Sequence, residues 1–172
     1  SPFPQDSLNR VRDVNNSYRR RDVSNSQKIS LDATWNVAKF QFFPSLEVQN
    51  LHRQLNYLRG RVDTTSTRRD WYVKPEFFVQ WKIRKGVTLK GGYEYSATPA
   101  DQLSQIAWVD NSNPLYITEG NPNLKDSYTH HVSLSFLGNI ARSVQSFQFT
   151  ADYRHFVNPI GTLFSYDSTT GV

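Results

Sequence analysis

The chain has 172 residues, a formal net charge of +5 and an aromatic content of 14%, although its mean hydropathy is −0.62. It contains no apolar run near the ~20 residues that a membrane helix requires, so a helical membrane protein is excluded. It also contains no cysteine, which excludes disulfides, thiolate metal sites and cysteine nucleophiles.

Polar and apolar residues alternate along much of the chain, as they do in β-strands with one apolar face. Between Trp71 and Ile83 this alternation is regular, and Pro75 is the position there that removes a ladder hydrogen bond. In the segment from Phe40 the apolar phase shifts near Asn50, which indicates a β-bulge or a strand that leaves the apolar layer. The alternation predicts strands at about residues 28–37, 40–58, 68–83, 87–97, 128–137 and 143–157, long loops at 1–27, 59–67 and 98–127, and a further strand from residue 162.

The connections between these strands are expected to be short and long in turn. Outer-membrane β-barrels have tight turns on the periplasmic side and longer loops outside, and their tilted strands cross the bilayer in about 9–11 residues. The sequence therefore predicts an all-β fold, in which an antiparallel meander of transmembrane strands forms part of a large outer-membrane β-barrel. Residues 1–172 are expected to be one partial barrel domain.

The aromatic residues gather toward the ends of the predicted strands. Amphipathic rings at both membrane interfaces are typical of outer-membrane barrels, so two bands are predicted. Trp35, Phe40, Trp81, Phe136 and Phe147 lie beside the short turns, and Trp71, Tyr93, Tyr95, Tyr128 and Tyr153 lie toward the long loops.

The other face of the predicted strands carries alternating charges. Its carboxylates are Asp32, Glu47, Glu76, Glu94 and Asp152, and its basic residues are Lys28, Lys74, Lys82, Lys90 and Arg154. Cross-strand pairing of these charges along a hydrated interior is favoured over acid–base catalysis. His130 and His131 are adjacent in a strand and point to opposite faces, so they cannot bind one ion together. No catalytic residue, metal site or cofactor is predicted, and the protein is not expected to be an enzyme.

Several arginines fall in predicted loops or, for Arg68 and Arg69, at the start of the strand predicted from residue 68, and acidic residues are mixed with them. They are Arg10, Arg12, Arg19, Arg20, Arg21, Arg68 and Arg69. This mixture is typical of solvated loops, and no nucleic-acid partner is expected. A basic loop rim is also suited to contact anionic lipopolysaccharide or an anionic ligand.

A distinctive motif occurs at Gly120, Asn121, Pro122, Asn123 and Leu124, followed by Lys125. These residue types favour a turn that brings a long loop back to the strand beginning at Tyr128. The motif resembles the barrel region of TonB-dependent outer-membrane receptors, and most of all the outer-membrane β-barrel family abundant in Bacteroidetes. The resemblance covers residues 70–157 and, more loosely, 1–69. Where the family usually has Pro-Glu after the lysine, this chain has Asp126-Ser127.

The resemblance implies a complete barrel of about 22 strands, most of them supplied by the rest of the polypeptide. It implies a receptor that binds a large nutrient, such as an iron chelate, a glycan or a peptide, and imports it with TonB-type energy coupling. The implied partners are outer-membrane lipid and lipopolysaccharide, a plug domain, a TonB-type energy transducer and a surface lipoprotein.

Ligand contacts are predicted within the loops of this barrel. The candidates are Arg68, Arg69, Trp108, Asp110 and Asn111, because aromatic and polar loop residues suit the recognition of sugars or chelates. Two alternatives have the same side-chain pattern. One is a soluble or surface β-sandwich binding module, which covers its apolar face with a second sheet. The other is a structural outer-membrane barrel in a secretion or assembly complex.

Overall fold

The computed structural model describes residues 17–59, 62–107, 109–113, 116–139 and 145–164. Its strands are β1 (Tyr18–Asp32), β2 (Trp35–Val37), β3 (Phe40–Arg59), β4 (Val62–Arg84), β5 (Val87–Thr98), β6 (Val109–Asn113), β7 (Tyr116–Glu119), β8 (Ser127–Asn139) and β9 (Ser146–Val157). A single short 3-10 turn, η1 (Leu103–Gln105), is the only helical element of these residues.

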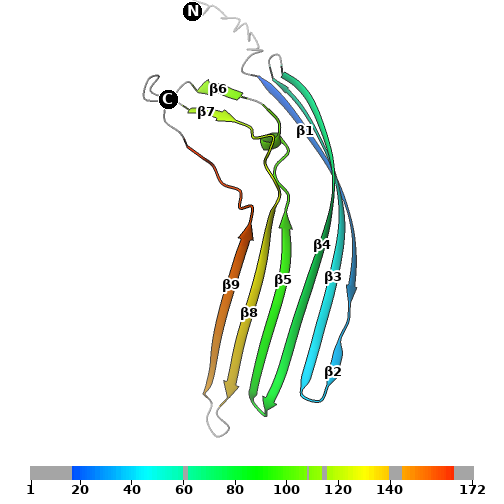
Figure 1. Ribbon diagram of the computed structural model, residues 1–172, viewed down its shortest axis with the longest axis vertical. Coiled ribbons are helices and arrows are strands. Elements are labelled where there is room, and N and C mark those ends of the chain that lie inside the picture. The colour runs from blue at the N-terminus through cyan, green and yellow to red at the C-terminus, as the bar shows by residue number, and fades with distance from the viewer. Residues whose placement is uncertain (1–16, 60–61, 108, 114–115, 140–144, 165–172) are drawn as a thin grey trace, which may run out of the picture.

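The long strands form one antiparallel sheet in the order β1-β3-β4-β5-β8-β9 (Figure 1). Strand β2 pairs with β3 in continuation of β1, and β6 and β7 form a separate hairpin. Within the described residues the sheet is open, and its edges are β1 and β9. The predicted all-β antiparallel meander is therefore confirmed. No helix in the described part of the chain is long and apolar enough to cross a membrane.

The two faces of the sheet differ in exposure on β4, whereas the edge strands β1 and β9 are exposed on both faces, apart from Val157 at the end of β9. From Thr64 to Glu76 the even-numbered side chains of β4 are buried or half-buried, whereas from Asp63 to Phe77 its odd-numbered side chains are exposed. The strand registers extend both faces across the sheet. We call the first the sheltered face and the second the exposed face.

The exposed face is the apolar one. Ile29, Leu31, Trp35, Trp71 and Phe149 are each at least 62% exposed, and among the described residues no second sheet or helix covers them. Water-soluble folds bury such side chains, and a contiguous apolar surface of this kind normally marks a contact with lipid or with another protein.

Strand β1 begins ten residues earlier than predicted and occupies part of the predicted loop 1–27. Its first half pairs with β3 although polar residues predominate on both of its faces, so no apolar alternation reveals it. The predicted strand 28–37 is interrupted between β1 and β2, opposite Pro44. Pro44 accepts a hydrogen bond from the N–H of Ala33 (3.0 Å) but has no N–H with which to complete the ladder.

The predicted long loop at 59–67 is wrong. Strand β3 ends at Arg59 and β4 begins at Val62, and β3 is paired along its whole length with residues 62–81 of β4. Residues 64–67 read Thr-Thr-Ser-Thr, and the β-branched threonines favour a strand even where neither face is apolar. The β3–β4 hairpin therefore extends well beyond the apolar part of the sheet.

Strand β3 has no bulge near Asn50, because its register with β4 is unbroken from Phe40 to Arg59. The apolar residues beyond Asn50, namely Leu51 and Leu55, lie on the sheltered face and are buried. The bulge is therefore wrong, and the other interpretation, a strand that leaves the apolar layer, describes β3.

The remaining predicted boundaries are close to the observed ones or fall partly outside the described residues. The strands predicted at 40–58, 87–97 and 128–137 match β3, β5 and β8 to within two residues. Strand β9 begins at Ser146 instead of 143, and residues 143–144 lie outside the described residues. The predicted loop 98–127 also contains η1 and the β6–β7 hairpin. No strand begins at residues 162–164, and the rest of that prediction lies outside the described residues.

Gly92 of β5 provides a test of the packing on the sheltered face. A Cβ atom there would lie 2.6 Å from Cδ1 of Phe78 and 2.8 Å from Oγ of Ser133. We expect Gly92→Ala to lower the free energy of unfolding by about 1–3 kcal/mol, because these neighbours must move. At the adjacent Gly91 a Cβ would lie 3.4 Å from Val79, so Gly91→Ala should change it by less than about 1 kcal/mol. Urea unfolding of both variants measures the difference, and equal losses would contradict this packing.

Candidate functional site

Charges on the sheltered face are paired across strands. Lys74 Nζ lies 2.9 Å from Oε1 of Glu47, and Lys28 Nζ lies 3.6 Å from the same oxygen. On β8 and β9, His131 Nε2 lies 2.9 Å from Oδ1 of Asp152. The predicted cross-strand pairing of charges is confirmed for Glu47 with Lys74 and Lys28, and it stabilises a face that carries many charged groups.

The chain between β5 and β8 lies over the sheltered face at the end where the β3–β4 hairpin closes (Figure 1). Both ends of this connecting segment, residues 99–126, are fixed against the sheet. Ala100 is fully buried, and Asp126 is only 4% exposed. A buried carboxylate requires charged or hydrogen-bonding partners, and the sheet supplies them.

The partners of Asp126 come from β4 and from the start of the connecting segment. We call Arg53, Arg68, Asp70, Tyr72 and Asp126 the anchor cluster. Oδ2 of Asp126 accepts hydrogen bonds from Arg68 Nη2 (3.0 Å) and from the hydroxyl of Tyr72 (2.8 Å). Its Oδ1 accepts the backbone N–H of Ala100 (2.9 Å). One carboxylate thus joins both ends of the connecting segment to the sheet.

Asp70 holds the two arginines of the anchor cluster together. It accepts hydrogen bonds from Arg53 Nη2 (3.0 Å) and Arg68 Nε (2.7 Å), while Arg53 Nη1 donates to the carbonyl oxygen of Ala100 (2.7 Å). Burial lowers the pKa of Arg68, but Asp70 and Asp126 outweigh burial and raise the pKa above its ordinary value. Because Arg53 and Arg68 are directly opposite each other, these carboxylates also relieve the repulsion between them.

Buried apolar side chains lie beside the anchor cluster on the sheltered face of β3. Arg53 is flanked there by Leu51 and Leu55, Tyr57 follows Leu55, and all three neighbours are buried. The side chain of Gln102, which is 5% exposed, donates to the carbonyl oxygen of Arg53 (3.4 Å). Excluding water in this way strengthens the ion pairs of the cluster.

A more exposed ion pair joins the connecting segment to β1. Arg20 Nη2 lies 2.8 Å from Oδ1 of Asp101, and their side chains are 32% and 49% exposed. A hydrogen bond to Asp22, together with Asp101, raises the pKa of Arg20 above its ordinary value. Because water screens this pair, we expect it to stabilise the segment by no more than about 1 kcal/mol.

The Gly120–Leu124 motif forms a turn inside the connecting segment. Asn121 Oδ1 accepts the N–H of Asn123 (2.9 Å), and the carbonyl oxygen of Asn121 accepts the N–H of Leu124 (3.0 Å). The N–H of Asn121 donates to the carbonyl oxygen of Ser104 (2.7 Å). Gln105 Nε2 donates to the carbonyl oxygen of Leu124 (2.8 Å). The two ends of the segment are thereby joined to each other.

The predicted ligand-contact residues do not form one group. Arg68 lies on the sheltered face in the anchor cluster, whereas Arg69 points to the exposed face. The backbone of Asp110 and Asn111 belongs to β6, and Trp108 lies outside the described residues. Among the described residues, no group of three or more His, Asp or Glu side chains is placed to hold a metal ion.

The predicted interface aromatics lie on the exposed face, and several are in contact across strands. Phe40 stacks on Trp81 with ring centroids 5.4 Å apart, and Tyr95 stacks on Tyr128 at 5.9 Å. His130 shares this face, where its Nδ1 lies 2.9 Å from the hydroxyl of Tyr93. Trp35, Trp71, Phe147 and Tyr153 are exposed, Phe40 and Trp81 are each 37% exposed, and Tyr93, Tyr95, Tyr128 and Phe136 are half-buried.

Sequence reasoning missed Arg53, Asp70, Tyr72 and Asp126 as a group. The signal becomes visible only once the hairpin register is known, because the register sets Arg53 opposite Arg68. Two opposed arginines need a nearby carboxylate, and Asp70 is two residues from Arg68. Comparison of the sequence with family models and with curated proteins finds no match.

Asp126 and Asp101 make a matched pair for testing how the connecting segment is held. We expect Asp126→Ala to lower the free energy of unfolding by about 2–4 kcal/mol, because it leaves Arg68, Tyr72 and the Ala100 N–H without their acceptor. Asp101→Ala should cost less than about 1 kcal/mol, because its ion pair is exposed.

Hydrogen exchange measured over residues 99–126 checks this difference at the segment itself. Exchange should become much faster in Asp126→Ala and change little in Asp101→Ala. Slow exchange in both variants would contradict the role given to the anchor cluster.

Proposed function

We propose that the protein forms part of the wall of an outer-membrane receptor that binds a large nutrient and imports it with TonB-type energy coupling. The nutrient classes are an iron chelate, a glycan or a peptide. The observation that carries this proposal is the sidedness of the sheet, with uncovered apolar side chains on one face and charged side chains on the other. That arrangement suits a wall with lipid on one side and a hydrated interior on the other.

The spacing of two tryptophans supports a membrane of ordinary thickness. Trp71 and Trp81 lie on the exposed face of β4, ten residues apart, which is about 33 Å along a strand. The tilt of about 40° that is common in outer-membrane barrels reduces this length to a height of about 25 Å, which equals the usual apolar band. Beyond Trp71 the exposed face becomes polar, with Arg69 and Thr67 next in the row.

The open edges of the sheet support a larger barrel. In a membrane an unpaired edge strand would leave N–H and C=O groups without partners, so β1 and β9 require further strands. On this proposal the rest of the same barrel supplies them. Lipid and lipopolysaccharide surround the exposed face, and a plug domain, a TonB-type transducer and a surface lipoprotein are the further partners.

The connecting segment is the part of the chain best placed to meet a ligand. It lies over the sheltered face at the end of the sheet beyond Trp71, which on this proposal is the extracellular mouth. The β6–β7 hairpin lies between the two ends of the segment, which are hydrogen-bonded to each other through Gln105 and Leu124. Asp110 and Asn111 belong to this hairpin. Ligand contact by Asp110, Asn111 and Trp108 belongs to this proposal.

Neither alternative has a comparable observation behind it. A β-sandwich module needs a second layer over the apolar face, and none lies there in the described residues. A structural barrel would share the wall, but a segment folded over the polar side and fixed by a buried carboxylate suits a ligand-binding mouth better than an empty scaffold.

The lipid contact predicts a difference between two adjacent positions of β8. Val132 lies on the exposed face midway between Tyr128 and Phe136, whereas Ser133 lies on the sheltered face opposite Asp152. We expect Val132→Arg to destabilise the protein in lipid vesicles by about 2–4 kcal/mol, because it places a charge in the hydrocarbon layer. Ser133→Arg should cost less than about 1 kcal/mol, because its neighbour is a carboxylate in the hydrated interior. Urea unfolding in vesicles measures both, and equal costs would argue against lipid on the exposed face.

Transport is tested by deleting the gene and supplying each nutrient class as the only source of iron or carbon. We expect growth to fail on one class only and to return with the wild-type gene. Dissipating the inner-membrane proton gradient should stop uptake of that nutrient without stopping its binding to cells. Normal growth of the deletion strain on ferric chelates, glycans and peptides alike would overturn the receptor function.

A further inference from the structure

Six arginines near the hairpin end of the sheet divide into two groups according to the face that they occupy. Arg20, Arg53 and Arg68 lie on the sheltered face, and each forms an ion pair with an aspartate. Arg19, Arg21 and Arg69 lie on the exposed face and are themselves exposed. None of these three is ion-paired within the part of the chain that the structure describes. We call Arg19, Arg21 and Arg69 the outward arginines.

The outward arginines all lie beyond Trp71, where the apolar part of the exposed face ends. Arg69 is two residues beyond Trp71 on β4, and its partner in β3 is His52. Arg21 and Arg19 of β1 pair with Asn56 and Leu58 of β3, farther toward the hairpin tip.

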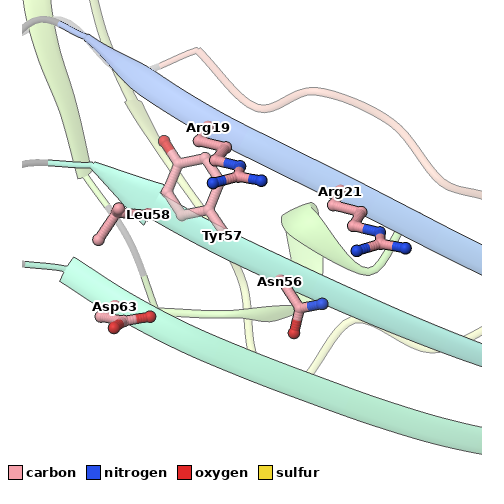
Figure 2. A pocket seen from close by; sticks show the side chains of 6 residues that line it. All are labelled: Arg19, Arg21, Asn56, Tyr57, Leu58 and Asp63. Carbon is pink, nitrogen blue, oxygen red and sulfur yellow. The ribbon is translucent and has the colours of Figure 1, made fainter.

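Figure 2 shows Arg19 and Arg21 beside Asn56 and Tyr57 in a shallow pocket that Leu58 and Asp63 also line. Asp63 is the only acidic residue on the exposed face of β1, β3 and β4 beyond Trp71 in the described residues. Three arginines and one aspartate leave this surface with a net positive charge.

We propose that the outward arginines bind the phosphate groups of a phosphorylated glycolipid in the outer leaflet. Guanidinium groups match phosphate oxygens with paired hydrogen bonds, and in the described residues neither Asp63 nor any other carboxylate forms an ion pair with the outward arginines. The inference rests on the proposed function, because it requires lipid against the exposed face. It goes further by naming the lipid chemistry and the residues that recognise it.

The heights of the outward arginines favour sugar phosphates over a single layer of phospholipid phosphates. Arg69 lies about 7 Å along the strand beyond Trp71, within the interfacial layer of about 5–8 Å. Arg69 pairs with His52 of β3 and Arg21 pairs with Asn56, four residues farther along that strand, which adds about 13 Å. Arg19 lies two residues beyond Arg21. A headgroup that reaches all three must carry phosphates at more than one height, as phosphorylated sugars do.

The test is a titration of the full-length protein in detergent micelles with purified lipopolysaccharide. Each basic side chain near an anionic surface contributes about fivefold to binding, so R19Q/R21Q/R69Q should bind roughly a hundredfold more weakly than wild type. The matched control is K82Q/K90Q/R154Q, which removes three positive charges from the opposite face of the sheet. Its three side chains are also accessible to solvent, and the variant should bind lipopolysaccharide as wild type does.

Lipopolysaccharide treated with a phosphatase separates phosphate recognition from sugar recognition. It should bind wild type as weakly as the intact lipid binds R19Q/R21Q/R69Q, and the triple variant should lose little more. Unchanged binding by the triple variant, equal loss in the control variant, or full binding of the treated lipid would each overturn the proposal.

Quenching of tryptophan fluorescence by lipids with brominated chains tests the membrane position separately. Trp35, Trp71 and Trp81 lie on the exposed face, so they should be quenched in wild type and in both triple variants. Absence of quenching would remove the proposed function and this inference with it. Normal quenching with unchanged lipopolysaccharide binding would remove only the role of the outward arginines.

Discussion

The constraint on which the rest of the structure depends is that the apolar face of the sheet has no protein layer to cover it. Period-two alternation sets most apolar side chains of the central strands on that face, with Leu51 and Leu55 as exceptions, and backbone pairing keeps the alternation in phase from β1 to β9. The charged side chains then share the opposite face, where they neutralise one another across strands. On the proposed function, the surrounding lipid makes this arrangement stable.

Where the apolar face ends, a different set of interactions takes over. In the halves of β3 and β4 next to the turn that joins them, the exposed face is mostly polar. The sheltered face there carries buried or half-buried side chains, so the hairpin needs a partner on that side. The connecting segment is that partner. The anchor cluster joins it to both strands through groups that lie away from water, and the ion pair of Arg20 with Asp101 adds a weaker attachment at β1.

The sequence was sufficient to predict the fold class and most strands, because apolar alternation is visible wherever one face of the sheet is apolar. It failed at residues 18–27 and 62–67, where polar side chains occupy both faces of the strands and the apolar alternation disappears. The candidate site was harder still, because Arg53, Asp70 and Asp126 come together only through the register and the fold of the connecting segment. Asp126 stands where the resembled family usually has proline, yet its role required the structure.

The connecting segment has two parts: its ends, which are held against the sheet, and the β6–β7 hairpin between them. Residues 99–105 and 121–126 are tied to each other and to the sheet, whereas the β6–β7 hairpin lies between these two stretches. Insertions, deletions and substitutions in the β6–β7 hairpin can therefore accumulate without altering the large sheet. Such a design lets one scaffold acquire new recognition properties by changing a short stretch of about a dozen residues, as surface loops on rigid frames commonly do.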